Sequence, residues 1–181
     1  MIETYTKQYW LNEIKDSAQF LESLYRTKSW ETEVEFKTEK AIFVGFYAIR
    51  KLKESKLLNN EVHGLNTSLK SNRIRTDCIV NNEDHWSKKY NLGQSDDQHL
   101  NLEKLCNQFI HSKLYSPFFQ PGLGCLGFYF ASDNEYTKHI YYLQLIKVIN
   151  IFLSVANNKH IKLDLEVNGS DISVADIEMH T

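Results

Sequence analysis

The most apolar stretch of the chain, AIFVGFYAI at residues 41–49, sets the first constraint on its fold. It lies within residues 32–58, where Thr32 and Glu35 have the spacing of a capping box and the final turns are basic, as expected for a helix. The middle of this helix has almost no polar face, so neighbouring elements must cover it. We therefore predict a central helix in a hydrophobic core. The apolar run is too short to cross a bilayer.

The hydropathy pattern divides the rest of the chain into helical and strand-like segments. Apolar residues recur every three or four positions in three further predicted helices, at residues 6–25, 98–115 and 143–158. Alternating or aromatic-rich runs predict strands at residues 73–80, 124–133, 137–143, 161–167 and 171–179. Asn168-Gly169 is typical of a tight hairpin turn. The polar segments 59–72 and 81–98 are predicted loops, the second with a helical turn around residues 86–92.

Together these segments predict an α+β fold. We expect about four helices, three of them N-terminal and long, and about five mostly antiparallel strands concentrated in the C-terminal third. A length of 181 residues suits a single domain with one sizeable core. Within residues 1–181 we expect a helical part at about 6–115, with one strand near 73–80, followed by a hairpin–helix–hairpin part at about 118–179.

Composition and charge exclude several classes of protein. Hydrophobic residues make up 42% and charged residues 24% of the chain, which is typical of a globular protein and not of a disordered one. The formal net charge of −2 gives no general field for nucleic acid, so such binding needs a local basic patch. Cys78, Cys106 and Cys125 form no C-x-x-C pair and are expected to be reduced thiols. Residues 1–17 lack a signal-peptide pattern, which predicts a soluble cytoplasmic protein with no membrane association.

Two polar residues in the predicted helix 98–115 are candidates for a functional site. Asn107 and His111 are four positions apart and therefore share one face, on which Leu100 and Leu114 lie before and after them. One interpretation is structural, because both side chains can satisfy buried polar groups and hold the helix against the sheet. The other is that this leucine-flanked face is an interface or a site. The residues alone leave both interpretations open.

The sequence CNQFIH at residues 106–111 resembles the R-x-x-x-x-H motif of the HEPN family, in which a polar residue, often Asn, commonly follows the Arg. The resemblance implies a late helix of a four-helix bundle, a dimer and, in many members, metal-independent ribonuclease activity in toxin–antitoxin or phage-defence systems. It implies that His111 is catalytic and that Asn107 orients the histidine or the phosphate. Cys106 stands where the family has arginine, and a thiol cannot bind phosphate as a guanidinium does. Arg50 is the candidate to supply that charge; its alternative role is a structural ion pair.

A second candidate surface is basic. Lys70, Arg73 and Arg75 lie at the start of the predicted strand 73–80, and the two arginines share one of its faces. Together with the basic end of the central helix they could bind nucleic-acid phosphates; the alternative is a solvated strand face. The aromatic residues of the C-terminal third could stack on bases, but a role in the sheet core explains them more economically.

Other kinds of site find less support. Acids and histidines in the loops could ligate a metal, namely Glu83, Asp84, His85, Asp96, Asp97 and His99. Acids ahead of a helix serve more often as N-caps, a role that Asp96 or Asp97 fits, so we expect neither a metal nor a cofactor. The segment PGLGCLG lacks the lysine of a P-loop and the helix that follows a dinucleotide-binding turn, and no G-x-S-x-G motif occurs.

These observations lead to one preferred function and two alternatives. We expect a small binding or accessory protein, a homodimer or a subunit of a larger assembly, with protein and RNA contacts; its bacterial defence or toxin–antitoxin setting comes only from the resemblance. The missing arginine favours binding over catalysis. The enzyme alternative is a HEPN-like, metal-independent ribonuclease that uses His111. The third possibility is an antitoxin-like or inhibitor-like module that docks through the leucine-flanked face or an open sheet edge.

Overall fold

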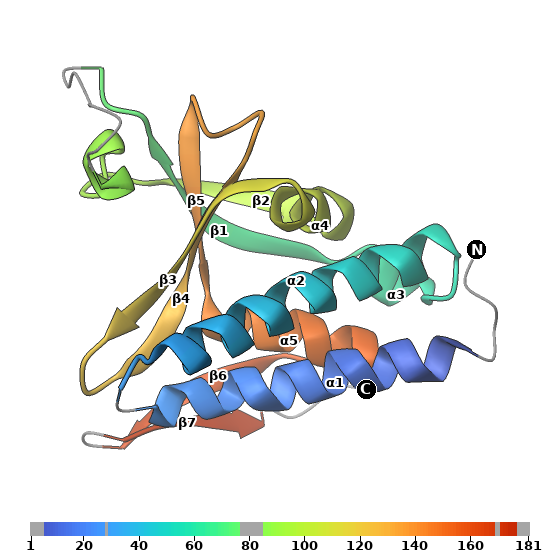
Figure 1. Cartoon of the computed structure of the whole chain (residues 1–181). Coiled ribbons are helices and arrows are strands. Elements are labelled where there is room, and N and C mark those ends of the chain that lie inside the picture. Colours follow the sequence, from blue (N-terminus) through green and yellow to red (C-terminus); the bar gives the residue numbers. More distant parts are fainter. Residues whose placement is uncertain (1–5, 28, 77–84, 169–170, 177–181) are drawn as a thin grey trace.

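The computed structural model describes residues 6–27, 29–76, 85–168 and 171–176, and its α+β architecture confirms the predicted fold class (Figure 1). The helices are α1 (Lys7–Ser23), α2 (Thr32–Glu54), α3 (Asn60–His63), α4 (Leu102–Ile110) and α5 (Leu145–Ala156), with 3-10 turns η2 (Leu24–Arg26) and η3 (Trp86–Lys89). The strands are β1 (Asn66–Arg73), β2 (Asp96–Asn101), β3 (Ser112–Gln120), β4 (Gly124–Ser132), β5 (His139–Gln144), β6 (Leu163–Asn168) and β7 (Asp171–Asp176).

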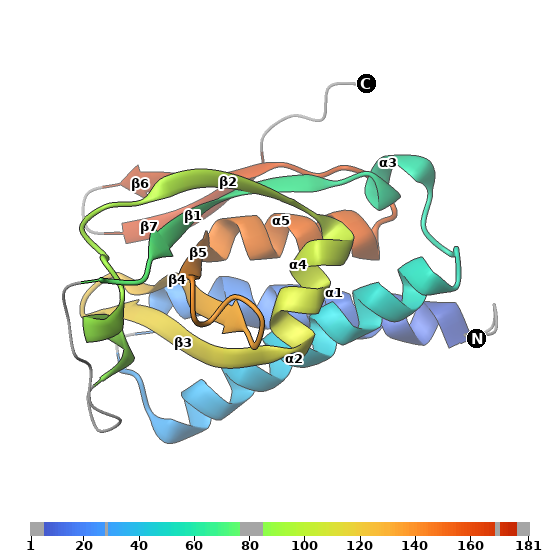
Figure 2. The same cartoon turned by 90° about the horizontal axis from the view of Figure 1, so that it is seen from above.

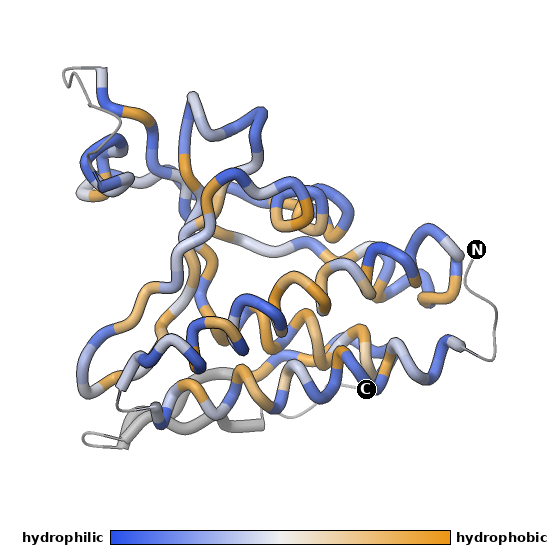
Figure 3. The backbone as a smooth tube through the Cα atoms, in the orientation of Figure 1, coloured by the Kyte–Doolittle hydropathy of each residue, from blue (hydrophilic) through white to orange (hydrophobic). Residues whose placement is uncertain are grey.

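Five of the strands form one antiparallel sheet in the order β2-β1-β5-β4-β3, and β6 and β7 form a separate hairpin. Helix α1 packs along both α2 and α5, so that the three helices form a layer beside the sheet (Figure 1). Viewed from above, α4 lies between the end of β2 and the C-terminal half of α2 (Figure 2). The most apolar helical segments are α5 and the middle of α2, which belong to the same core (Figure 3).

A column of aromatic rings joins the helices to the sheet. Phe46 of α2 stacks on Phe109 of α4, with ring centroids 4.2 Å apart, and Phe109 stacks on Phe130 of β4 at 4.1 Å. All three side chains are fully buried. Phe152 of α5 meets the Phe46 ring edge-on at 5.1 Å and lies over Gly45, where a Cβ atom would come within 2.3 Å of its ring. Helix α2 therefore sits where α4, α5 and the sheet converge.

The elements with strong local patterns are confirmed. Helices α1 and α5, the β4–β5 hairpin and the β6–β7 hairpin form where predicted, and η3 is the helical turn expected in the long connection. Residues 169–170 of the last turn and 177–179 of the last predicted strand lie outside the described residues. Helix α2 forms as well, but its N-cap is Glu31, without a side-chain cap, and it ends at Glu54. Tyr47 is 44% exposed, so one side of the central helix faces solvent.

The long helix predicted over residues 98–115 is wrong at both ends. Strand β2 continues to Asn101, whose Oδ1 accepts a hydrogen bond from the backbone N–H of Lys104 at 2.9 Å and so caps α4. The helix ends at Ile110, and from Ser112 onward the chain pairs with β4. Pairing with neighbouring strands overrides the helical period here. The N-cap role expected of Asp96 or Asp97 is wrong too, because both belong to β2.

The loop predicted at residues 59–72 is also wrong, because it contains α3 and most of β1. Strand β1 is polar, with the sequence NTSLKSNR, and it forms because β2 and β5 pair with it on its two sides. Of the strand predicted at 73–80, the described residues show only the end of β1 and an isolated bridge between Ile74 and Tyr90; residues 77–80 lie outside them. The buried Asn72 amide donates to the carbonyls of Asn91 and Gln94 and fixes the segment that follows η3.

The outer strands of the five-stranded sheet, β2 and β3, are irregular or polar. Strand β3 contains Pro117 and shows two register shifts against β4, one near each end. Strand β2 has the sequence DDQHLN, and only Leu100 in it is buried. These features suit edge positions, where a missing N–H or a charged side chain costs no internal hydrogen bond.

Candidate functional site at the junction of helices α2 and α4

Helices α2 and α4 enclose a cleft of about 220 Å³. The stacked rings of Phe46 and Phe109 hold the two helices together, so the next turns of α2 lie beside the middle of α4. The cleft is lined by Arg50, Lys53, Glu54, His63, Glu103, Cys106 and Asn107. Most of these side chains are charged, and they come from three separate helices.

Arg50 and His111, both singled out from the sequence, are in contact at this junction. Nη1 of Arg50 lies 3.4 Å from Nε2 of His111, which is the exposed C-cap residue of α4. A guanidinium can only donate hydrogen bonds, so Nε2 is the atom of this contact that can accept one. The pair thus combines a permanent cation with an exposed imidazole. These are groups that can bind a phosphate oxygen and accept a hydroxyl proton.

Carboxylates already balance the cations of the cleft. Nε of Arg50 donates to Glu54 at 2.7 Å, and Nζ of Lys53 lies 3.2 Å from Glu103. The hydrogen bond from Arg50 lowers the pKa of the Glu54 carboxyl, with Lys51 adding to the effect. The Arg50 side chain remains 34% exposed. An incoming anion would therefore have to compete with Glu54 for the guanidinium.

Asn107 and Cys106 occupy the inner wall of the cleft. Oδ1 of Asn107 is buried and accepts no hydrogen bond from any described residue, a costly arrangement for an amide oxygen. The Cys106 thiol is fully buried, and this burial raises its pKa to about 12 despite the nearby charges of Arg50 and Lys53. Cys106 is therefore a neutral core residue, while Arg50 supplies the guanidinium beside it.

The leucine-flanked helix face expected around Asn107 and His111 is not present. Leu100 belongs to β2 and Leu114 to β3, and both are buried. His111 follows α4 instead of lying within it, and its backbone N–H bonds to the carbonyl of Asn107 at 3.1 Å. The five-stranded sheet also sets the protein apart from the four-helix bundle that the resemblance implies.

The basic residues expected to form a patch with Arg50 lie along β1 instead. Lys70 pairs with Asp97 at 2.8 Å and Arg73 with Asp96 at 3.1 Å, both across the β1–β2 ladder. The hydrogen bond from Lys70 lowers the pKa of the Asp97 carboxyl. Arg75 is exposed just beyond β1, where its backbone N–H bonds to Lys89. The structure brings Arg50 to His111 but does not add these three residues to that site.

The other residues considered from the sequence are the aromatic residues of the C-terminal third and the possible metal ligands. Phe128, Phe130 and Tyr141 are buried in the sheet, whereas Phe118, Tyr129 and Tyr142 form a partly exposed ring cluster. The described part of the chain contains no group of three or more metal-ligating side chains, and the candidate ligands Glu83 and Asp84 lie outside it. No helix among the described residues is long and apolar enough to cross a membrane.

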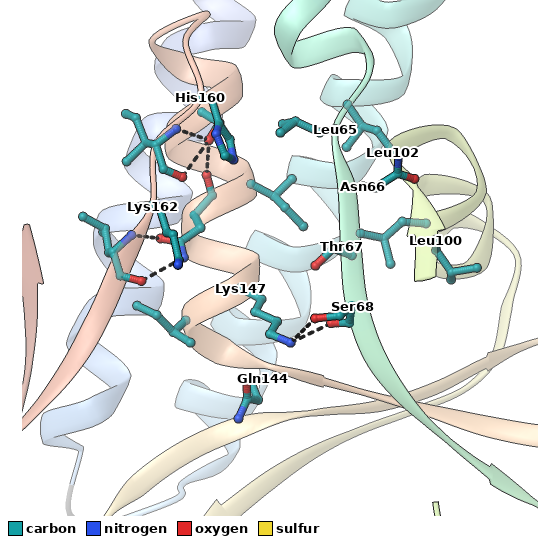
Figure 4. A pocket seen from close by; sticks show the side chains of 17 residues that line it. Leu65, Asn66, Thr67, Ser68, Leu100, Leu102, Gln144, Lys147, His160 and Lys162 are labelled. Carbon is teal, nitrogen blue, oxygen red and sulfur yellow. Dashed lines mark hydrogen bonds between the residues drawn. The ribbon is translucent and has the colours of Figure 1, made fainter. Parts of the chain in front are cut away.

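A larger groove of about 340 Å³, which was not predicted from the sequence, lies between β1, α5 and residues 160–163. Its one half-buried cation is Lys147, the only charged residue of the mostly apolar helix LIKVINIFLSVA (Figure 4). That single lysine is the signal in the sequence that could have located the groove, because a lysine is rarely buried in a core helix unless its ammonium group has a partner.

In comparisons with known proteins, no family model, no curated protein and no solved structure matches this chain.

Proposed function

We propose that this chain is a small cytoplasmic binding protein that holds a phosphate-bearing partner, RNA, at the Arg50–His111 contact. The observation that supports it is the 3.4 Å contact between these two side chains, which are sixty-one positions apart in the sequence and meet beside a cleft. A guanidinium next to an imidazole offers N–H donors to two oxygens of one phosphate. The bacterial defence or toxin–antitoxin setting implied by the HEPN-like motif belongs to the same proposal.

The site suits local recognition of a phosphate group. The chain carries a net charge of −2 and the basic residues of β1 are paired with acids, so affinity must come from a few cations. The Arg50 side chain is 34% exposed, and its Nη1 lies 3.4 Å from the exposed His111. Because so few charges take part, RNA affinity should fall only modestly as the salt concentration rises. The slope of log K against log[salt] should correspond to about two phosphate contacts.

The test is the affinity for a short single-stranded RNA, measured by fluorescence anisotropy at low ionic strength. We expect Arg50→Gln to weaken binding about tenfold or more, the effect of losing one charge-assisted hydrogen bond. Glu54→Gln should act in the opposite direction and tighten binding about threefold, because it releases Arg50. The matched control is Arg73→Gln, which removes an ion-paired arginine elsewhere and should leave affinity nearly unchanged.

Two outcomes would contradict this assignment. If Arg73→Gln weakens RNA binding as much as Arg50→Gln, the RNA lies on β1 and not at the α2–α4 junction. If the wild-type chain binds neither RNA nor a DNA of the same sequence, the proposed function is wrong.

A second candidate function, RNA cleavage, is favoured by the position of the exposed His111 beside Arg50. When the Arg50 guanidinium turns its N–H groups to the phosphate, Nε2 of His111 is released and can take the proton of a ribose 2′-hydroxyl. The 2′ oxygen then attacks the adjacent phosphorus, the 5′ oxygen leaves with a proton from water, and a cyclic phosphate remains. His111→Ala should abolish cleavage of a labelled RNA, whereas wild-type protein that binds RNA without cutting it excludes the enzyme.

The proposal also includes a second copy of the chain as protein partner, as the resemblance implies. Tyr9 of α1 and Tyr47 of α2 are 76% and 44% exposed, and Tyr47 touches Trp10, so aromatic surface is available on the outer side of this helix pair. Light scattering of the purified protein should give twice the mass of one chain. A monomeric mass at high protein concentration would remove the dimer from the proposal.

A further inference from the structure

The groove between β1 and α5 exists because β1 separates from the rest of the sheet. Strand β1 pairs with β5 only from Lys70 to Arg73, whereas its first half pairs with β2 alone. Where β5 ends the chain turns into α5, so the free side of residues 66–69 faces this helix across open space (Figure 4). Residues 160–163 close the opposite side.

The segment opposite β1 is fixed by side-chain hydrogen bonds. Asn150 of α5 pairs with both backbone groups of Leu163, donating at 3.0 Å and accepting at 2.9 Å, in the manner of a neighbouring strand. Ser154 binds both backbone groups of Ile161, and the N–H of His160 donates to Glu61. The groove is thus bounded by ordered backbone on both sides, and its volume is in the range of sites for small molecules.

About half of the residues that line the groove are apolar, and the rest are polar, with Lys147, His160 and Lys162 among them. Leucine and isoleucine side chains line the groove at positions 65, 100, 102, 105, 146, 151, 161 and 163. Lys147 extends from α5 toward β1, where its Nζ donates to the carbonyl and to the hydroxyl of Ser68 at 2.8 and 2.7 Å (Figure 4). An ammonium has three donors, and the third finds no acceptor among the described residues.

The surroundings of Lys147 favour an anion. None of the described residues forms an ion pair with Lys147, and burial lowers its pKa, with Asp97 partly opposing that effect and Lys70 adding to it. Lys147 lies in the first turn of α5, whose N-cap, Gln144, provides no side-chain cap and whose first turn contains no acid. The positive end of the helix dipole therefore adds to the field of the ammonium.

We propose that this groove binds a small amphiphilic carboxylate, whose carboxylate accepts the third N–H of Lys147 and whose apolar part packs on the leucine and isoleucine walls. The charge of the ligand follows from the unpaired ammonium and the uncapped helix end. Its apolar character follows from the lining. The site is separate from the Arg50–His111 contact, and none of its lining residues belongs to the α2–α4 cleft.

Isothermal titration calorimetry with three probes that share one hydrocarbon chain tests this site on the full-length protein. Octanoate should bind at least tenfold more tightly than octanol, whose hydroxyl can accept from Lys147 but carries no charge, and than octylammonium, which is a cation. Equal affinity for octanoate and octanol, or no heat of binding with octanoate, overturns the proposal.

Variants then locate the site. Lys147→Met keeps the apolar stem and should weaken octanoate binding at least tenfold without changing octanol binding, whereas Lys104→Met, which removes an exposed lysine of α4, should change neither. If Lys147→Met does not fold, Thr67→Trp provides the same test, because this half-buried residue projects into the groove and the larger side chain should block both probes (Figure 4). Unchanged octanoate binding by whichever of these folds overturns the assignment.

Discussion

Phe109→Ala is expected to lower the free energy of unfolding by about 3–5 kcal/mol, the range for removing a large aromatic side chain from a core. Phe109 is fully buried between Phe46 and Phe130, with ring centroids 4.2 and 4.1 Å away. Its loss leaves a cavity between a helix and the sheet that neither neighbour can fill without moving its backbone. Urea denaturation followed by circular dichroism measures the change.

The matched control for this prediction is Phe36→Ala, the same substitution on α2 at a side chain that is 64% exposed. It should change the free energy of unfolding by no more than about 0.5 kcal/mol. Similar losses for the two variants would mean that the aromatic column is not the centre of the core.

Gly124→Ala is expected to lower the free energy of unfolding by about 2–5 kcal/mol. Gly124 has a φ of +76°, a conformation that costs an L-residue about 1–2 kcal/mol. A Cβ atom there would also lie 2.3 Å from the carbonyl oxygen of Leu24 and 3.1 Å from the backbone of Tyr25, and such a backbone collision adds about 1–3 kcal/mol. Either the start of β4 or the turn η2 must move to admit the methyl group.

Gly122→Ala separates these two contributions. Gly122 has a similar φ of +85°, but nothing lies within 4 Å of the position its Cβ would take, so only the conformational cost remains. Thermal and urea unfolding of both variants should show a clearly larger loss for Gly124→Ala. Equal losses would mean that the contact between β4 and η2 relaxes without cost.

The parts of the fold that could be predicted are those whose pattern is local. Helices α1 and α5 carry a clear helical period, and the two C-terminal hairpins carry alternating or aromatic-rich runs. Strands β1 and β2 do not, because their sequences NTSLKSNR and DDQHLN are polar and are held by pairing with partners distant in the chain. Pro117 follows the predicted helix 98–115, where a proline is typical of a helix end, but it lies inside β3, an edge strand that tolerates it.

The candidate site was predictable in part. His111 and Arg50 could be named from the sequence because their chemistry stands out on segments that otherwise look like core. That they touch depends on the crossing of α2 and α4, which no local pattern contains. The salt bridges that neutralise Lys70 and Arg73 depend on the β1–β2 register. This register could not be predicted, because β2 itself was not predicted from the sequence.

The two outer strands of the sheet bear on how the protein can assemble. Pro117 and the register shifts interrupt β3, and β2 is short, polar and exposed except at Leu100. Both borders therefore disfavour the addition of a further strand, so the outer strands themselves oppose edge-to-edge growth of this sheet into a polymer.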